Sequence, residues 1–479
     1  MPSSPDKHLH MIKARDFNAA IEALNKLQSN FTVIEEIHKL GKPARDENLI
    51  PEMIEWTRRI GYSPEDFDRM NVLHVTGTKG KGSTSSFVQS ILMQYRDREV
   101  KRVGLYTSPH LKSICERIMI DGQPLSKDKF AKYFFQVYDR LENTSSDPVK
   151  YPRMGPGIKP QYFRYLTLVS FHAFMEEKVD SAIFEVGIGG EYDSTNVFIA
   201  PKGTAVTSLG IDHVHVLGDT VEKIAWNKAG IFKRNVPAFT IDDQPSTALD
   251  VLRERAIEKG TTLTVVPVHP QIKDIKLGLN GDFQRKNATL AVHLAAARLG
   301  CSIDALPQKF VIGLETASWP GRCQTLTSNG VKWFIDGAHT TDSLELAASW
   351  CGQVCDRSTP ISLLFNQQKR EEVENLLKSL HIALDKAGVK VSDAYFSTNQ
   401  SWDKGFQADM ISINVSKAEV DSLAVQKQLA KLYSELSPST TTHVCSSLEQ
   451  VVNSLQPGTQ ILATGSLLMI GGLLTVIDP

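Results

Sequence analysis

A glycine-rich segment at residues 77–83, with the sequence GTKGKGS, follows an apolar stretch and precedes an amphipathic one. In that setting glycines let backbone N–H groups surround phosphate oxygens, and the following helix N-terminus adds a partial positive charge. Lys81 would neutralise a transferred phosphate. Val75 and Gly82 replace the first glycine and the metal-binding hydroxyl residue of the common G-x4-G-K-[ST] pattern. The segment therefore predicts a phosphate site in which Ser83 is a poor magnesium ligand.

Three polar clusters follow other apolar stretches and could supply the ligands that this loop lacks. Ser108, within the sequence TSPH, offers a hydroxyl, and His213 follows an aspartate. Glu185 lies inside an apolar stretch, where a carboxylate is costly to bury unless it is paired or binds a cation. These residue types indicate a cation site.

Lys228 falls on the apolar face of a helix that we expect to begin near Asp219. Val221, Ile224 and Lys228 are spaced at i, i+3 and i+7, which places them on one side of a helix. A buried lysine usually has a partner or is chemically altered. The residues leave both interpretations open, a modified lysine and an ordinary ion pair.

Two further candidates lie in the second half of the chain. The sequence DGAH at residues 336–339 follows an apolar stretch, so Asp336 and His339 are candidate ligand contacts. A helix-capping aspartate beside a hydrogen-bonded histidine is the alternative. Arg322, in the sequence WPGR, is placed to reach a nucleotide held between two domains.

The elements that must position these side chains alternate between short β-branched stretches and helix-period stretches. This alternation is typical of βαβ units around a mainly parallel sheet, with ligands at the carboxyl ends of its strands. We predict an α/β fold with an N-terminal domain at residues 1–318, a linker at 319–330 and a smaller C-terminal domain at 331–479. The predicted strands span residues 72–75, 103–107, 182–186, 204–209, 236–240, 331–335, 361–365, 393–397 and 460–464, and predicted helices include 84–94 and 287–299.

The composition limits what the chain binds. Its 479 residues carry 53 Lys and Arg against 54 Asp and Glu, a formal net charge of −1, so we expect no nucleic-acid partner. No apolar run reaches the roughly 18–20 residues that span a bilayer, so we expect no transmembrane segment. The six cysteines are too scattered for a zinc site or a disulfide framework. We expect a cytoplasmic protein, with the mitochondrial matrix as the alternative compartment.

Six motifs, in this order, resemble the folylpolyglutamate synthase family of the Mur ligase superfamily. They are GTKGKGS, YTSPHL, FEVGIGGEYDSTNV, SLGIDHVHVLGDTVEKIAWNKAGIFK, WPGR and DGAH. Lys79 and the stretch YFRYLTLVSFHAFMEEKVD are similar to the eukaryotic enzymes. After His339 the resemblance rests mainly on ATGS at residues 463–466.

The resemblance implies an ATP-dependent ligase that adds L-glutamate to the γ-carboxylate of tetrahydrofolate and its polyglutamates through an acyl phosphate. It also implies a P-loop ATPase domain, a Rossmann-like second domain and an active site between them. The implied partners are ATP, L-glutamate and reduced folates, and the implied cofactors are two Mg²⁺ ions, K⁺ and a carbamate on the lysine.

Site residues carry over from the same motifs. The implied catalytic residues are Lys81, Glu185, His213, Lys228 and His339. The implied ATP contacts are Gly77, Lys79, Gly80, Lys81, Gly82, Ser83, Arg322 and Asp336. Ser108 and Glu185 would bind one Mg²⁺, and Glu185, His213 and carbamylated Lys228 the second. The implied substrate contacts are His110, His339 and Ser466.

Two alternatives compete with this reading. Dihydrofolate synthase shares the motifs and the chemistry but uses dihydropteroate as the acceptor. A P-loop switch that controls a partner is the alternative from another class. The sequence NKAG at residues 227–230 is not the N-K-x-D that reads guanine, and a switch does not require the DGAH sequence. We expect a monomer.

Overall fold

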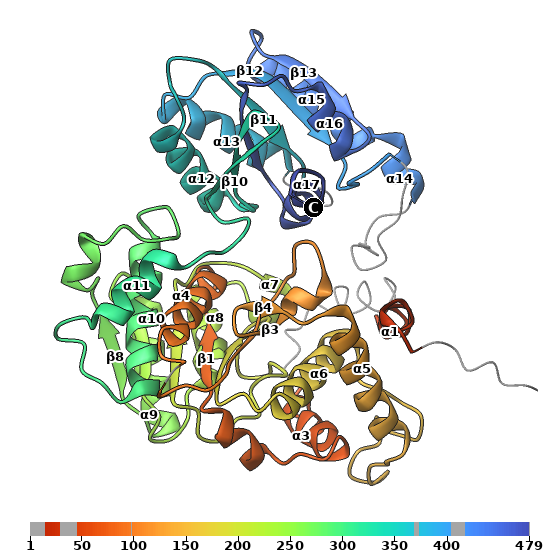
Figure 1. Cartoon of the computed structure of the whole chain (residues 1–479), viewed down its shortest axis with the longest axis vertical. Coiled ribbons are helices and arrows are strands. Elements are labelled where there is room, and N and C mark those ends of the chain that lie inside the picture. Colours follow the sequence, from red (N-terminus) through yellow and green to blue (C-terminus); the bar gives the residue numbers. More distant parts are fainter. Residues whose placement is uncertain (1–14, 29–45, 97, 368–372, 404–416, 479) are drawn as a thin grey trace, which may run out of the picture.

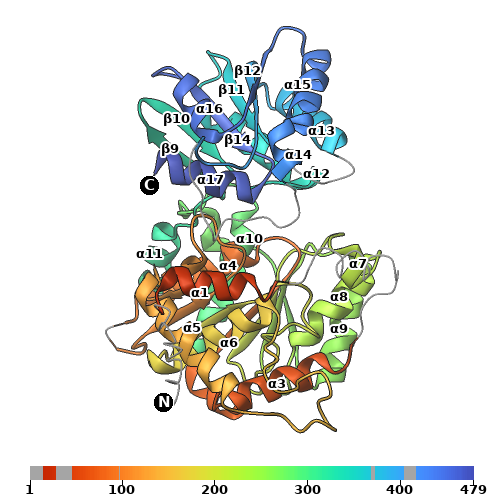
Figure 2. The same cartoon turned by 90° about the vertical axis from the view of Figure 1, so that its right-hand side faces the viewer.

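The structure is a computed structural model, and it describes residues 15–28, 46–96, 98–367, 373–403 and 417–478. These residues form two β-sheets, each with helices on both faces, and one sheet lies above the other in Figures 1 and 2. The predicted α/β class is confirmed.

In the described part of the chain, the first sheet has eight strands in the order β4-β3-β2-β5-β1-β6-β7-β8. The strands from β2 to β8 in this order are parallel, whereas β3 and β4 extend one edge in antiparallel pairs. The carboxyl ends of the parallel strands therefore share one edge. The bounds are β1 (Leu73–Thr76), β2 (Val103–Tyr106), β3 (Ile118–Ile120), β4 (Gln123–Pro124), β5 (Ser181–Glu185), β6 (Gly203–Val206), β7 (Ala238–Ile241) and β8 (Leu263–Val266).

Two layers of helices cover this sheet because its strands are apolar on both faces. Within β5, Phe184 belongs to the core that includes α1, α3, α5 and α6, while the adjacent Ile183 belongs to the core that includes α4, α10 and α11. The helices are α1 (Phe17–Asn25), α3 (Leu49–Arg59), α4 (Lys81–Met93), α5 (Lys127–Glu142), α6 (Tyr162–Glu176), α7 (Val214–Leu217), α8 (Val221–Lys228), α9 (Ser246–Lys259), α10 (Gln284–Leu299) and α11 (Gln308–Thr316). Short 3₁₀ turns are η1 (Pro64–Met70), η2 (Ile114–Arg117), η3 (Ala229–Ile231) and η4 (Pro270–Lys273).

The described strands of the second sheet have the order β13-β12-β11-β14-β10-β9, and only β9 and β10 pair antiparallel. Helices α12, α13 and α15 cover one face, and α16 and α17 cover the other. The strands are β9 (Gln324–Ser328), β10 (Val331–Ile335), β11 (Ile361–Phe365), β12 (Val391–Ser397), β13 (Thr441–Cys445) and β14 (Gln460–Thr464). The helices are α12 (Thr341–Val354), α13 (Val373–Lys386), α14 (Lys417–Ser422), α15 (Ala424–Leu436), α16 (Leu448–Ser454) and α17 (Leu467–Ile477).

The loop after β2 of the first sheet contacts the second sheet and α17. Leu111 of this loop packs with the core between the second sheet and α17. A Cβ atom at Gly471 would overlap the Leu111 carbonyl oxygen, and one at Gly321 would crowd its side chain. Lys112 Nζ lies 3.1 Å from Asp478 Oδ2, just beyond α17. The loop is therefore fitted to the second sheet at both its backbone and its side chains.

Several boundaries differ from the sequence-based expectation. The strand expected at residues 204–209 ends at Val206, because Ser208 accepts hydrogen bonds from the glycine-rich loop instead. Helix α8 begins at Val221 rather than near Asp219, because Thr220 is its N-cap. Strand β9 lies inside residues 319–330, which we expected to be a linker, and pairs with β10. The division into two domains stays a prediction.

None of the helices in the described residues is long and apolar enough to cross a membrane.

Candidate functional site

The glycine-rich loop joins β1 to α4, as predicted, and two of its glycines are required by the geometry. Gly77 has a φ of +151° and Gly80, the N-cap of α4, has a φ of +91°. Any side chain at Gly77 would overlap Thr207, and any at Gly80 would overlap Asn287. Only glycine combines these backbone angles with such close packing.

Hydrogen bonds hold this loop in place from two sides. The backbone N–H groups of Thr78 and Lys79 donate to the Ser208 carbonyl at 2.9 and 3.1 Å. Ser83, which is 5% exposed, accepts a hydrogen bond from Gln284 Nε2 at 3.2 Å. The loop is thus preorganised at the helix N-terminus, the arrangement that binds phosphate.

Two lysine amines converge on one carbonyl of the loop. Lys81 Nζ donates to the Gly77 oxygen at 3.0 Å, and Lys228 Nζ donates to the same oxygen at 2.8 Å. Lys228 is 3% exposed, and no carboxylate of the described residues forms an ion pair with it. Burial, and then the charge of Lys81, lower the pKa of the Lys228 amine well below its ordinary value. An ordinary ion pair, one of the two interpretations of Lys228, therefore lacks an acidic partner among the described residues.

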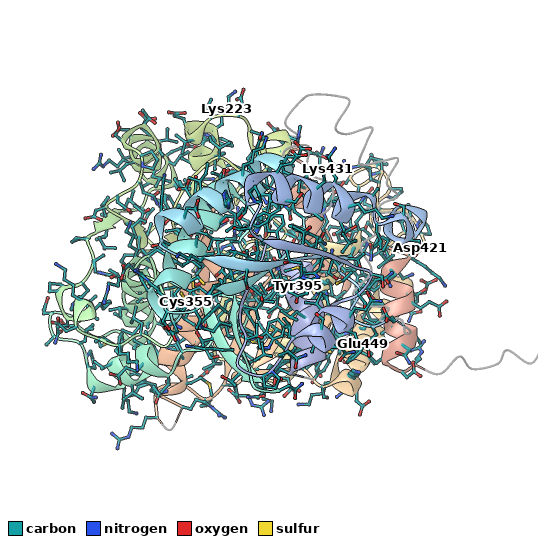
Figure 3. All side chains as sticks on the ribbon, turned by 90° about the horizontal axis from the view of Figure 1, so that it is seen from above. Lys223, Cys355, Tyr395, Asp421, Lys431 and Glu449 are labelled. Atoms are coloured by element: carbon teal, nitrogen blue, oxygen red, sulfur yellow. The ribbon has the colours of Figure 1, made fainter. Side chains whose placement is uncertain are left out.

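Helix α8 carries a second lysine in a contrasting position. Lys223 Nζ lies 2.8 Å from Asp219 Oδ1 and is half-exposed. Figure 3 shows Lys223 at the periphery of the molecule. Only Lys228, at the inner end of this helix, reaches the glycine-rich loop.

Glu185 ends β5 at the sheet edge where the loop lies. It is 4% exposed and accepts hydrogen bonds from Thr107 Oγ1 and from the Ser108 backbone N–H, the latter at 3.3 Å. Burial raises the pKa of its carboxyl, and the charges of Lys81 and Arg322 oppose that rise. The structure thus brings Glu185, Ser108 and Lys81 into one region, as the motifs imply.

The oxygen atoms at and around Glu185 are of the kind that bind a hard divalent cation. Carboxylate and hydroxyl oxygens are the ligands that Mg²⁺ prefers, and a bound cation would compensate a buried carboxylate. Glu185 receives only a hydroxyl and an amide hydrogen bond, with no direct ion pair among the described residues. Its surroundings therefore fit the predicted metal.

His213 stands apart from this group in its exposure. It is the N-cap of α7 with a φ of +50°, its side chain is 47% exposed, and its Nε2 lies 3.9 Å from Asp212 Oδ2. Within the described part of the chain, no three His, Cys, Asp or Glu side chains are grouped as a metal site. The role of His213 as a ligand stays a prediction.

The second sheet contributes Asp336 and Arg322. Asp336 follows β10, is 8% exposed and accepts a hydrogen bond from the Cys323 N–H at 2.8 Å. Burial raises the pKa of its carboxyl, and the charge of Arg322 opposes the rise. A Cβ at Gly337 would lie 2.7 Å from Arg322 Nη1, so the missing side chain leaves room for the guanidinium. The two predicted nucleotide contacts therefore lie side by side.

The remaining substrate candidates follow neighbouring strands. His339 Nδ1 lies 2.9 Å from the Gly337 oxygen, after β10, and Ser466 is the N-cap of α17, after β14. The Gly465 N–H donates to the Ala338 oxygen at 2.9 Å and ties the two segments together. His339 and Ser466 therefore share the carboxyl edge of the second sheet.

Three predicted residues have contacts that the motifs did not indicate. Lys79 Nζ lies 3.1 Å from Asp342 Oδ2, in the first turn of α12. Because this ion pair is exposed and such pairs are weak, phosphate can replace Asp342 at low cost. His110 Nδ1 accepts a hydrogen bond from Arg117 Nε at 2.9 Å. Gly82 lies against the side chain of Trp319, where a Cβ would be 2.9 Å from the indole nitrogen.

Asp193 is a partly buried acidic residue near Glu185 that the sequence analysis missed. Its carboxylate accepts hydrogen bonds from the N–H groups of Gly187, Ile188 and Thr195 at 3.1, 3.3 and 2.9 Å. These bonds fix the turn that follows Glu185. An aspartate two residues before a threonine is a turn pattern, and it was the available signal.

No family model matches the chain. Curated relatives do: the folylpolyglutamate synthases of Saccharomyces cerevisiae strains YJM789 and S288c are each 46% identical over 482 residues, with 97% of this chain and 87% of the relative covered.

Solved structures share the fold. The Mycobacterium tuberculosis folylpolyglutamate synthase complexed with ADP and AMPPCP is 23% identical, with 97% of this chain and 99% of that chain covered and a TM-score of 0.69. The Thermotoga maritima folylpolyglutamate synthase is 22% identical, with 96% and 97% covered and a TM-score of 0.69. An FPGS complexed with AMPPCP and folate is 21% identical, with 97% and 100% covered and a TM-score of 0.66. At 46% identity over 97% of its length, the chain belongs to the folylpolyglutamate synthase family.

Proposed function

We propose that this chain is an ATP-dependent ligase that adds L-glutamate, through a γ-linkage, to tetrahydrofolate and its polyglutamates. One observation carries the proposal. Groups from the two sheets act on one another. Lys81 of the glycine-rich loop and the buried Glu185 come from the first sheet, and the charge of Arg322, which acts on Asp336 of the second sheet, also acts on Glu185. The family relatives and the neighbour solved with AMPPCP and folate support the same substrates.

The reaction requires activation of an unreactive carboxylate. A γ-carboxylate oxygen attacks the γ-phosphorus of ATP, so that ADP leaves and an acyl phosphate forms. The glutamate amine then attacks the acyl carbon, and inorganic phosphate leaves as the amide forms. Phosphoryl transfer needs positioning and charge neutralisation more than covalent help.

The chain's own groups supply both requirements. The loop N–H groups and the α4 N-terminus surround phosphate oxygens, and Lys81 neutralises the charge on the transferred group. Glu185 and Ser108 would hold a Mg²⁺ ion, which when bound would neutralise phosphate charge as a Lewis acid. The second Mg²⁺, K⁺, the cytoplasmic location and the monomeric state stay predictions.

We expect Arg322→Ala to raise the KM for ATP on the order of tenfold and the KM for tetrahydrofolate much less. The guanidinium is held beside Asp336 and the second sheet, so its loss removes a charged contact to nucleotide rather than to folate, and such contacts are worth about 1.5–3 kcal/mol. Steady-state titrations of each substrate measure the split.

Arg357→Ala is the matched control for this variant. Arg357 Nε donates to the Gly352 carbonyl at 2.6 Å, at the far end of α12, and we expect both KM values to stay unchanged. An ATP dependence of the Arg322 variant equal to that of the unaltered chain would contradict the nucleotide role.

A side-by-side assay tests the proposed function itself. Glutamate addition is measured with tetrahydrofolate and with dihydropteroate as acceptors, under the same ATP and Mg²⁺ concentrations. We expect turnover with tetrahydrofolate and elongation of its product by further glutamates. Turnover with dihydropteroate alone would favour dihydrofolate synthase, and ATP hydrolysis without amide formation would favour the switch.

A further inference from the structure

Arg117 is a buried cation that the proposed reaction does not yet use. It ends η2 and is 5% exposed. Its Nε donates to His110 Nδ1 at 2.9 Å, and its guanidinium carbon lies 5.6 Å from the centre of the Phe163 ring. Within the described residues, Arg117 has no ion pair with a carboxylate, and its buried Nη1 has no hydrogen-bond partner.

Such a group is costly unless something compensates it. A guanidinium carries a fixed positive charge. An unpaired buried charge and a buried N–H without an acceptor both cost free energy. A bound anion would remove both costs, because a carboxylate can accept from two guanidinium nitrogens at once.

Two other buried arginines beside the first sheet also leave one guanidinium nitrogen without a partner, but their remaining nitrogens donate to oxygen acceptors. Arg255, 3% exposed, pairs with Glu191 and with Glu258, the latter at 2.6 Å. Arg59, 2% exposed, has no such carboxylate contact but donates to the Leu141 oxygen at 2.5 Å and to the Thr144 oxygen at 2.8 Å. In contrast, Arg117 makes only the one hydrogen bond to an imidazole among the described residues.

The position of Arg117 ties it to the reacting centre. Its carbonyl oxygen accepts a hydrogen bond from the Thr107 N–H at 3.0 Å, and the Thr107 hydroxyl donates to Glu185. The N–H of Ser108, the next residue, also donates to Glu185. The backbone of Arg117 is therefore linked through Thr107, by two hydrogen bonds, to the carboxylate that we place at the metal. The ring of Phe163, which is itself 63% exposed, lies against the guanidinium.

We propose that Arg117 binds the α-carboxylate of the terminal glutamyl unit of the folate substrate, while the γ-carboxylate of the same unit is activated. The inference rests on the proposed function, because only a folate with a glutamyl unit carries a second carboxylate beside the reacting one. A spectator carboxylate is the anion that a fixed guanidinium next to the reacting carboxylate can select. Arg117 is thus a residue that distinguishes a glutamyl acceptor from dihydropteroate.

The test compares tetrahydrofolate with its α-amide, in which the α-carboxylate is a carboxamide and the γ-carboxylate is free. We expect the unaltered chain to show a KM for the α-amide about tenfold above that for tetrahydrofolate, since a charge-assisted contact is lost. In Arg117→Met the KM for tetrahydrofolate should rise about tenfold and the ratio between the two acceptors should fall to about one. KM values for ATP and glutamate should stay within about twofold of the unaltered chain.

Arg298→Met is the matched control, because Arg298 is largely buried and donates to Ser181 and to the Asp180 carbonyl, away from the reacting centre. Its ratio of the KM for the α-amide to the KM for tetrahydrofolate should stay near tenfold.

The same ratio in Arg117→Met, if equal to that of the unaltered chain, would overturn the proposal. A rise in the glutamate KM alone would also overturn it, because it would assign Arg117 to the incoming glutamate. If Arg117→Met does not fold, equal KM values for the two acceptors in the unaltered chain overturn it. Absence of any tetrahydrofolate turnover in the unaltered chain would instead contradict the proposed function.

Discussion

A Lys81→Ala variant is expected to lose glutamate ligation by a factor on the order of 10² or more, while it folds as the unaltered chain does. Among the described residues, Lys81 Nζ donates only to carbonyl oxygens of its own loop, at 3.0 and 3.4 Å, so its removal breaks no distant hydrogen bond. Its loss removes one of the cations that neutralise the charge developing on the transferred phosphate. Amide formation from tetrahydrofolate, glutamate and ATP is the measurement, with thermal unfolding as the check on folding.

Lys101→Ala serves as the control for this variant. Lys101 is exposed, and its backbone N–H rather than its side chain bonds Asp180. We expect its ligation rate to equal that of the unaltered chain. If a folded Lys81→Ala variant ligates within a few-fold of that rate, the phosphate-loop assignment is wrong.

A Lys228→Ala variant is expected to be comparably inactive, because we predict that Lys228 carries a carbamate when the enzyme is active. Burial and Lys81 lower the pKa of its amine, so more of it is neutral at physiological pH. The neutral nitrogen can form a bond to the carbon of CO₂ and release a proton. The product is an oxygen-donor anion, which suits a buried position beside a Mg²⁺ site better than an ammonium does.

Two measurements examine the carbamate. Acetate or formate added to Lys228→Ala should restore part of the activity by replacing the lost carboxylate, while the inactive Lys81→Ala variant should not respond. Lys223→Ala, on the exposed side of the same helix, should need no rescue. Mass spectrometry of the intact chain under mild conditions should show the added CO₂. An unmodified lysine in an active, metal-loaded protein would refute the modification.

The parts of the molecule that sequence could anticipate are those in which one residue breaks a strong local rule. Glu185 stands out because a carboxylate inside an apolar strand is costly, and Lys228 because a lysine interrupts an apolar helix face. Strands 331–335, 361–365 and 460–464 were predicted with their observed bounds, since each is a short apolar run between turns. The helix predicted at residues 287–299 ends at its observed last residue, Leu299, and Gly300 caps it with a φ of +65°.

The parts that could not be anticipated depend on contacts between distant segments. Strands β9 and β13 lie at the two edges of the second sheet and are rich in partly or fully exposed polar residues, so neither shows the apolar run on which our assignment relied. The ion pair between Lys79 and Asp342 joins the loop after β1 of the first sheet to α12, which covers the second sheet. The missing partner of Arg117 also becomes visible only when the surrounding side chains are placed.

The fit of Leu111 against Gly321 and Gly471 has a consequence for engineering. A side chain at either glycine position would crowd Leu111. The contact therefore depends on these particular residues and not on apolar character alone. A chimaera that takes the first sheet from one relative and the second from another must therefore carry the loop after β2 and α17 from the same parent. A graft that placed a bulkier residue at position 471 would set its side chain against the Leu111 backbone and push the two halves apart.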